Sequence, residues 1–571
     1  MPKGAKPIRK SARLAALAKK TRTNGRRNPS SSASSIRNMN STKLRPLDIP
    51  EILLLIGGFL DQDDLLNCIR VSKNFYRAFI RIIWRKITIV PFRYPSGKTL
   101  QNHKQYIEEI NFEANNIPEE YGALQGCDRL QTINYEGNYS WDEPICFLSM
   151  IWAHSSTITR VCLENVLSSY WPWKTLLECV HLNHLGLSFT YINGDGVDIF
   201  FQVCKKVKHL NLARVSIKQL PINFLSSEGS EYVLPSIHTL RIEDVDIISP
   251  PDPYTSSYCV GMLVRKCPGL CALEYGGYDL KSEFEQSAHE HFYRGAFLQH
   301  PWTLNNLTEL SFFSMIVTDE DMAILLRRVT GLKRLDVQFC AFGPLSMREL
   351  LAEEQEVLED GQIVRKRRDQ RLCDTIEVLG INIPNIRSDG IAQAILTNCP
   401  RLKRLAGSRI TIAEIVNGVQ WVSTGLTHLE INLVADVDQE TAEGMAKARI
   451  AFKQLGKLTQ LRCLDLTVWP LEGGERRTLD LRLRAGLDEL ANLKSLHTLA
   501  FRDDHHQQIE LGEATWILNN WPSIRCLKGC MDLILDKELN EDEKDIYTSI
   551  TKLLSKMRTC KKWICRGACT L

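Results

Sequence analysis

Two clusters contain the residue types that could do chemistry. His289-Glu290-His291 and His300 could together supply imidazole and carboxylate ligands to a metal ion. Their spacing fits no recognised zinc site, and no cysteine lies nearby. Cys560, Cys565 and Cys569 lie among basic residues, but three thiols without a regular pair are typical of free cysteines on a terminal cap. We therefore expect no metal site.

Other catalytic patterns are missing from the sequence. Gly473-Gly474 leads into Glu475-Arg476-Arg477 rather than the Gly-Lys-Ser/Thr ending of a phosphate loop, and no Gly-x-Ser-x-Gly elbow occurs. Carboxylates are abundant, but no pair stands out for acid and base work. The sequence predicts no catalytic residue, no cofactor and no enzyme, so the function must come from binding.

The elements that would position a binding surface follow a basic tail. Of the 71 Lys and Arg residues, 13 lie in residues 1–45, which hold no Asp or Glu, so the remaining 58 face 67 acidic residues. We predict that residues 1–43 are disordered and that the folded part is acidic. Basic clusters in the tail suit a nuclear import signal, a nucleic-acid contact or plain solvation. No segment suits a membrane partner, and we expect a cytoplasmic or nuclear location, or both.

Residues 44–90 read as a module of three short helices. Pro50 suits the first turn of a helix that carries apolar residues all round, from Ile52 to Leu60. A second helix starts at Asp63-Asp64, and Ser72 can cap a third that runs to Trp84. Three short helices cannot enclose this many large apolar side chains, so either the following domain or a partner protein must cover some of them.

The spacing within this module resembles the F-box. The resemblance rests on Leu47-Asp48-Ile49-Pro50-Glu51-Ile52, followed by Ile56, Leu60, Asp64-Leu65-Leu66, Val71-Ser72-Lys73 and Trp84. It implies docking on a Skp-family adaptor, and through it on cullin and RING subunits. The residues that it nominates for adaptor binding are Leu47, Pro50, Ile52, Ile56, Leu60, Leu65, Leu66, Val71 and Trp84, some of which can instead serve the module's own core.

A repeat with the sequence pattern apolar-x-x-apolar-x-apolar occupies the rest of the chain. Fourteen copies begin at Leu130, Ile158, Leu182, Val207, Ile237, Leu270, Leu307, Leu332, Ile376, Leu402, Leu426, Leu461, Leu496 and Ile524. Each copy predicts one short strand, and helical return segments are visible at residues 319–328 and 389–398. The pattern resembles leucine-rich repeats and predicts an α/β solenoid with a curved parallel sheet over residues 130–571, ending in a C-terminal cap. Residues 91–129 would form a linker and entry cap.

Residues between the apolar positions of each strand should face the concave side of the solenoid. Their mixture of both charge signs suits recognition of a protein better than of a polyanion. The candidates for substrate contact are Arg241, Glu243, Arg334, Asp336, His428, Glu430, Asp465 and Arg502.

One insertion between repeats has an unusual charge pattern. Residues 349–360 are acidic, and Arg365-Lys366-Arg367-Arg368 follows them closely. Opposite charges in adjoining stretches favour a self-paired helix or hairpin on the outside of the solenoid, with a second import signal as the alternative.

The two resemblances together imply a substrate receptor of a Skp/cullin/F-box ubiquitin ligase, which would act in ubiquitin-dependent degradation of an unknown protein substrate. Two alternatives remain at this point. One is a non-degradative leucine-rich-repeat scaffold, and the other is a nucleic-acid-associated protein that uses the basic tail.

Overall fold

The computed structural model describes residues 46–91, 93–113, 117–137, 145–168, 170–221, 223–225, 232–276, 283–300, 302, 304–313, 315–338, 340–360, 362–381, 390–467, 477–501, 504, 507–529, 532–533 and 541–555. The basic tail, Arg502, and the cysteines at 560, 565 and 569 lie outside these residues. Within the described part, no helix combines the length and apolar content needed to cross a bilayer.

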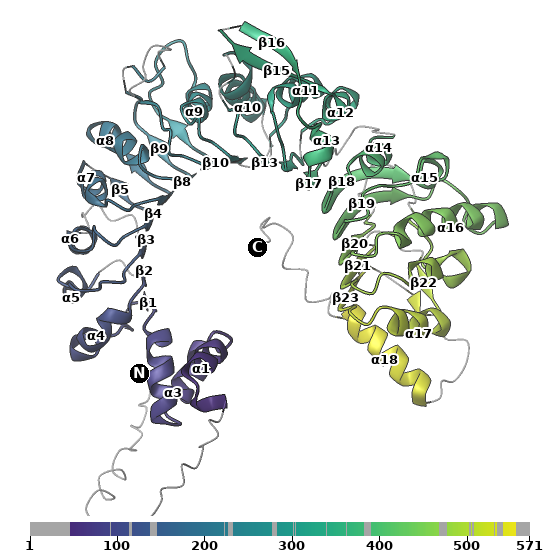
Figure 1. The fold of residues 1–571 in the computed structure, drawn as a ribbon, viewed down its shortest axis with the longest axis horizontal. Coiled ribbons are helices and arrows are strands. Elements are labelled where there is room, and N and C mark those ends of the chain that lie inside the picture. The colour runs from purple at the N-terminus through teal and green to yellow at the C-terminus, as the bar shows by residue number, and fades with distance from the viewer. Residues whose placement is uncertain are drawn as a thin grey trace, which may run out of the picture.

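A single parallel sheet of 16 strands runs through most of the chain and lines the inner side of an arch (Figure 1). Its strands, in spatial order, are β1 Lys86–Ile89, β2 Glu109–Phe112, β3 Thr132–Glu136, β4 Arg160–Glu164, β6 His184–Ser188, β8 His209–Ala213, β10 Thr239–Glu243, β12 Ala272–Gly276, β13 Glu309–Phe313, β14 Arg334–Asp336, β17 Val378–Gly380, β18 Arg404–Thr411, β19 His428–Val434, β20 Cys463–Asp465, β21 Thr498–Ala500 and β23 Cys526–Lys528.

Helices form the outer layer of the arch (Figure 1). They are α4 Gly97–His103, α5 Glu119–Gly122, α6 Ile145–Ala153, α7 Tyr170–Glu178, α8 Gly194–Cys204, α9 Ser256–Arg265, α10 Glu283–Tyr293, α11 Asp319–Arg328, α12 Pro344–Leu351, α13 Leu372–Thr375, α14 Ile391–Asn398, α15 Ile412–Asn417, α16 Ala442–Gly456 and α17 Leu511–Asn520. The last helix, α18 Glu541–Ser555, lies at the C-terminal end of the arch beside β23 (Figure 1). Minor strands are β5 Leu167–Ser168, β7 Tyr191–Ile192, β9 Ser216–Ile217 and β11 Asp246–Ile247 in one parallel sheet, and β22 Gln508–Ile509 with β24 Asp532–Leu533 in another.

All fourteen predicted repeat strands are present in the large sheet, and the predicted return helix at 319–328 is α11. The chain is therefore an α/β solenoid, in which one continuous buried cluster extends from Ile80 to Ile550. Each strand contributes its apolar side chains to that cluster, because a single repeat cannot bury its own apolar face.

The sheet starts two strands earlier than the leucine pattern predicts, at β1 and β2. The same pattern is present there as Trp84-x-x-Ile87-x-Ile89 and Ile107-x-x-Ile110-x-Phe112, with aromatic and β-branched residues where later repeats use leucine. These side chains are buried in the solenoid core. The residues expected to be a linker thus contain a repeat strand, and Trp84 belongs to the first repeat.

Three helices precede the sheet, namely α1 Pro50–Gly57, α2 Gln62–Cys68 and α3 Lys73–Ile83. Pro50 occupies the first turn of α1, as expected. The backbone N–H of Asp64 donates to the Asp61 carboxylate at 2.8 Å, and that of Phe75 donates to the Ser72 hydroxyl at 3.2 Å, so both later helices begin at side-chain caps.

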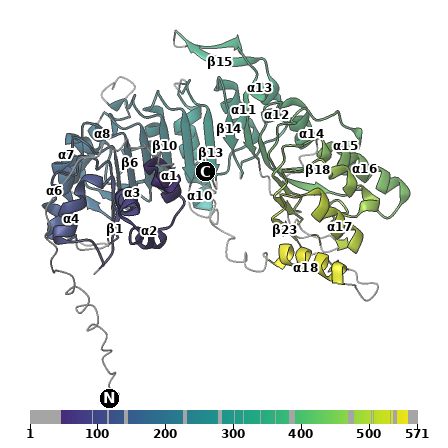
Figure 2. The ribbon, with the colours of Figure 1, turned by 60° about the horizontal axis from the view of Figure 1, so that its bottom comes forward.

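The charged insertion forms a hairpin. β15 Glu354–Glu359 pairs antiparallel with β16 Gln362–Arg367, and the pair projects outward beyond α11 and α12 (Figure 2). This confirms the self-paired arrangement predicted from the charge pattern and selects the hairpin over the helix.

Candidate functional site

Helix α1 carries two apolar faces, one buried and the other largely exposed. One face is buried, because Leu53 and Gly57 pack inward with Leu65, Ala78 and Phe79 of the other two helices. Gly57 permits this approach, since a Cβ there would lie 2.6 Å from Ile82 Cδ1. The module therefore has its own core, separate from that of the solenoid.

Among the described residues, the second face of α1 has no such cover. Residues i, i+3, i+4 and i+7 lie on one side of a helix, and here these positions are Ile52, Leu55, Ile56 and Phe59, which we call the apolar stripe. Leu55 is 66% exposed and Phe59, in the turn after the helix, is 84% exposed, while the two isoleucines are half-buried. Exposed apolar stripes of this kind are typical of surfaces that bind another protein.

The nominated adaptor residues divide among the apolar stripe, which holds Ile52 and Ile56, other exposed positions, and the two cores. Leu47, Pro50, Leu66 and Val71 are exposed, and Val71 reaches 71%. Leu65 is buried and Leu60 half-buried in the module's core, and Trp84 is buried in the solenoid core, against the ring of His103 at 4.7 Å. Leu65 and Trp84 thus present almost no surface to a partner. The nominated set omits Leu55 and Phe59. Their spacing of three and seven residues from Ile52 could have predicted that they share its side of the helix.

The nominated concave residues that the structure describes lie on one face of the sheet. The parallel register aligns Arg241 with Glu274 on the next strand, and Glu430 with Asp465. Glu243, Arg334 and His428 occupy neighbouring columns and are half-buried, while Asp336 is only 8% exposed. Arg502 lies outside the described residues.

Charges on this face largely neutralise one another. Arg241 lies 3.2 Å from Glu243 and 3.3 Å from Glu274, measured between the nearest nitrogen and oxygen atoms. Arg334 pairs with Asp336 at 3.3 Å, and Arg404 pairs with Glu430 at 3.5 Å. A surface of paired charges presents hydrogen-bonding groups of both kinds without a strong net field, which suits a protein ligand.

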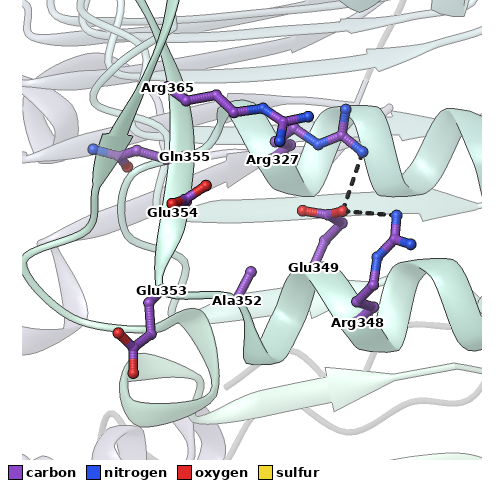
Figure 3. A pocket seen from close by; sticks show the side chains of 8 residues that line it. All are labelled: Arg327, Arg348, Glu349, Ala352, Glu353, Glu354, Gln355 and Arg365. Atoms are coloured by element: carbon purple, nitrogen blue, oxygen red, sulfur yellow. Dashed lines mark hydrogen bonds and ion pairs between the residues drawn. The ribbon is translucent and has the colours of Figure 1, made fainter.

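A pocket of about 520 Å³ lies at the base of the hairpin (Figure 3). It is lined by Arg327, Arg348, Glu349, Ala352, Glu353, Glu354, Gln355 and Arg365. Burial alone would raise the pKa of Glu349, but hydrogen bonds and charges from Arg327 and Arg348 hold it below its usual value. Glu349 therefore stays ionised and does not suit general acid catalysis.

Nucleophilic and metal chemistry find little support in the described part. Burial raises the pKa of Cys127, Cys179 and Cys259 to about 11, so these thiols remain protonated. His291 contacts Thr255 and His300 contacts Tyr258, at 3.2 and 2.8 Å, rather than each other. Within the described residues, no group of three or more His, Cys, Asp or Glu could hold a metal ion.

Comparison with known proteins identifies the N-terminal module. The F-box-like family model matches residues 50–90, which cover α1 to α3 and β1. The chain thus contains an F-box-like domain. No curated protein matches the chain in sequence.

Among solved structures, the chain aligns with one from the Toll–Spatzle complex, described as a molecular hub in Drosophila development and innate immunity. The TM-score is 0.39 and the identity 10%, over 81% of this chain and 57% of that one. This chain thus corresponds to little more than half the length of that structure.

Proposed function

We propose that this protein is the substrate-recognition subunit of a Skp/cullin/F-box ubiquitin ligase. The F-box-like domain docks on a Skp-family adaptor, which connects it to cullin and RING subunits, and the solenoid is a leucine-rich-repeat array that binds a protein substrate. The observation that carries the proposal is the exposed apolar stripe on α1, within the matched domain.

The protein itself performs no bond chemistry in this mechanism. It holds a substrate within reach of a ubiquitin-charged enzyme and so raises the effective concentration of substrate lysines at the thioester. Such a receptor works wherever the ligase works, so we propose a cytoplasmic or nuclear location, or both.

Adaptor binding is tested by substituting the stripe. Ile56→Asp is an ambiguous probe because Ile56 is half-buried, so the better variants are Leu55→Asp and Phe59→Asp. Each places an unpaired charge in the contact, and we expect adaptor affinity to fall by about 100-fold or more. The measurement is titration of the purified full chain with a purified Skp-family adaptor.

Val419→Asp is the matched control, because Val419 is 75% exposed but lies beside α15, far along the chain from the module. It should bind the adaptor like the parent chain. If the folded parent chain shows no adaptor binding, the proposed function is wrong. If it binds and the Leu55 and Phe59 variants bind equally well, the assigned face is wrong.

Substrate binding is tested separately on the concave face. Arg241→Glu replaces the cation between Glu243 and Glu274 with a third carboxylate, so we expect bound substrate to be lost while adaptor binding is retained. Phe59→Asp should show the opposite pattern. Quantitative mass spectrometry of proteins isolated with each variant measures both effects.

A further inference from the structure

The β15–β16 hairpin is built from complementary strands. On one face the cross-strand pairs are Glu354 with Arg367, Glu356 with Arg365, and Leu358 with Ile363. The other face pairs Gln355 with Lys366, and Val357 with Val364. Read from base to tip, β16 therefore prefers a neighbour that is acidic near the base and apolar near the tip.

The base of the hairpin is firmly attached to the solenoid. The buried Arg368 guanidinium donates to the carbonyl oxygens of Leu326 and Val329 at 2.7 Å and to that of Glu354 at 2.8 Å. Glu356 of β15 also pairs with Arg327 at 3.1 Å and with Arg328 at 3.5 Å. β15 thus packs against α11 of the arch.

The outer strand remains available. Within the described residues, β16 pairs with β15 alone, so the backbone groups on its other edge have no ladder partner. Ile363 is 54% exposed and Val364 is 37% exposed, although two-stranded hairpins usually need a further element to cover such residues.

Arg365 adds a positive charge that the other described residues of the hairpin do not neutralise through an ion pair. Its side chain reaches into the pocket at the hairpin base, and among the described residues it forms no ion pair (Figure 3). Its cross-strand neighbour Glu356 is already paired with Arg327 and Arg328. An incoming carboxylate beside Arg365 would therefore meet a cation that forms no ion pair of its own among the described residues.

We propose that the outer edge of β16 binds an extended acidic segment of a partner protein, which adds as a third, antiparallel strand. An added strand lies about 4.8 Å from β16 and repeats the side-chain environment that β15 provides. The partner segment therefore follows the pattern of β15 itself, acidic-x-acidic-apolar-apolar. Its acidic residues lie beside Arg367 and Arg365, and its apolar residues lie beside Val364 and Ile363.

The probe for this site is a fluorescent peptide with the sequence EEQEVLED, which is that of residues 353–360. We expect the full chain to bind it with an affinity that falls as salt rises. The control peptide QQQQVLQN, which lacks the charges, should bind at least tenfold more weakly. Absence of binding by the acidic peptide, or equal binding of both peptides, would overturn the proposal.

Two variants of the chain complete the test. Arg365→Glu should weaken peptide binding at least tenfold, whereas Arg401→Glu, an exposed site after α14, should leave it unchanged. Because Arg365→Glu also alters the contact with Glu356, Ile363→Ser serves as a second variant outside the charge network, and we expect at least a threefold loss. Wild-type affinity in both variants would overturn the proposal.

Hydrogen exchange identifies the mode of binding. Added protection of β16 with unchanged protection of β15 supports strand addition, while loss of protection in β15 shows displacement and contradicts it. Self-association that Ile363→Ser abolishes would make a second copy of the chain the occupant, which also contradicts the proposal. Phe59→Asp should bind the peptide normally, so failure of this site is distinguishable from failure of the proposed adaptor contact.

Discussion

At the scale of single residues, two neighbouring histidines stand out on the concave face among side chains that neutralise one another. The rings of His184 and His209 lie on adjacent strands with their centroids 5.9 Å apart. Burial lowers the pKa of His184 to about 4, and the charges of Arg160 and His209 act in the same direction. The folded protein therefore keeps this imidazole neutral at a pH where the unfolded chain protonates it.

The low pKa of His184 predicts a pH-dependent stability. The unfolded imidazole takes up its proton near pH 6.5 and the folded one near pH 4, so the free energy of unfolding falls as the pH drops through this window. His184→Gln removes this contribution. We expect its urea midpoint to fall less than that of the parent chain between pH 7.5 and pH 5. His238→Gln, at an exposed site, should behave like the parent. Equal slopes for parent and His184→Gln would contradict the assignment.

At the scale of elements, side chains from a following segment complete the ends of helices. The Lys206 ammonium donates to the carbonyl oxygens of Leu176 and Cys179 at the end of α7, at 2.9 and 3.0 Å. The Ser423 hydroxyl lies 2.7 Å from the carbonyl oxygen of Cys399, just after α14, and 3.1 Å from that of Leu396 in the last turn, so it can donate to either. These bonds satisfy carbonyls that a helix leaves unpaired, so adjacent repeats are coupled by hydrogen bonds as well as by their shared core.

Arg368 is another side chain that donates to carbonyls at the end of a helix, and it gives a prediction for the hairpin. Arg368→Ala removes hydrogen bonds to three carbonyls, two of them at the end of α11, which should cost about 3 kcal/mol locally. We expect the amides of β15 and β16 to exchange hydrogen about 100-fold faster. Arg367→Ala is the control, because that side chain is 82% exposed. Unchanged exchange in Arg368→Ala would show that other contacts hold the hairpin.

At the scale of the whole molecule, one helix serves two cores. Ala78 and Phe79 of α3 belong to the module's core, whereas Ile80 and the adjoining Trp84 belong to the solenoid core. Consecutive residues on one rigid helix therefore set the direction in which the module leaves the arch (Figure 1). In the proposed ligase, this direction sets where the concave face lies relative to the adaptor.

Trp84 is the residue that tests this joint. Trp84→Ala leaves a large cavity in the first repeat and should lower the free energy of unfolding by about 3 to 5 kcal/mol, as measured by urea denaturation. Adaptor affinity of the folded protein should stay within about twofold of the parent, because Trp84 faces the solenoid. A large loss of adaptor affinity in a folded Trp84→Ala chain would place Trp84 in the adaptor contact after all.

The sequence alone predicted the features that depend on near neighbours in the chain. These include the three short helices with the Ser72 cap of the third, fourteen of the sixteen sheet strands, and the self-paired charges of the insertion. Periodicity and capping are local, so a reader of the sequence can see them. The first two repeats were not predicted, because β1 and β2 carry aromatic and β-branched residues at positions where the later repeats carry leucine.

Exposure was decided by the tertiary structure. Leu65 and Leu66 are adjacent and of one type, yet one is 5% and the other 38% exposed, because α2 turns only the first toward Phe79. The same reasoning separates Trp84, which the solenoid covers, from Phe59, which nothing in the described chain covers. The sequence set the amount of apolar surface on the module, but the packing of three helices and the first repeat decided which part remains for a partner.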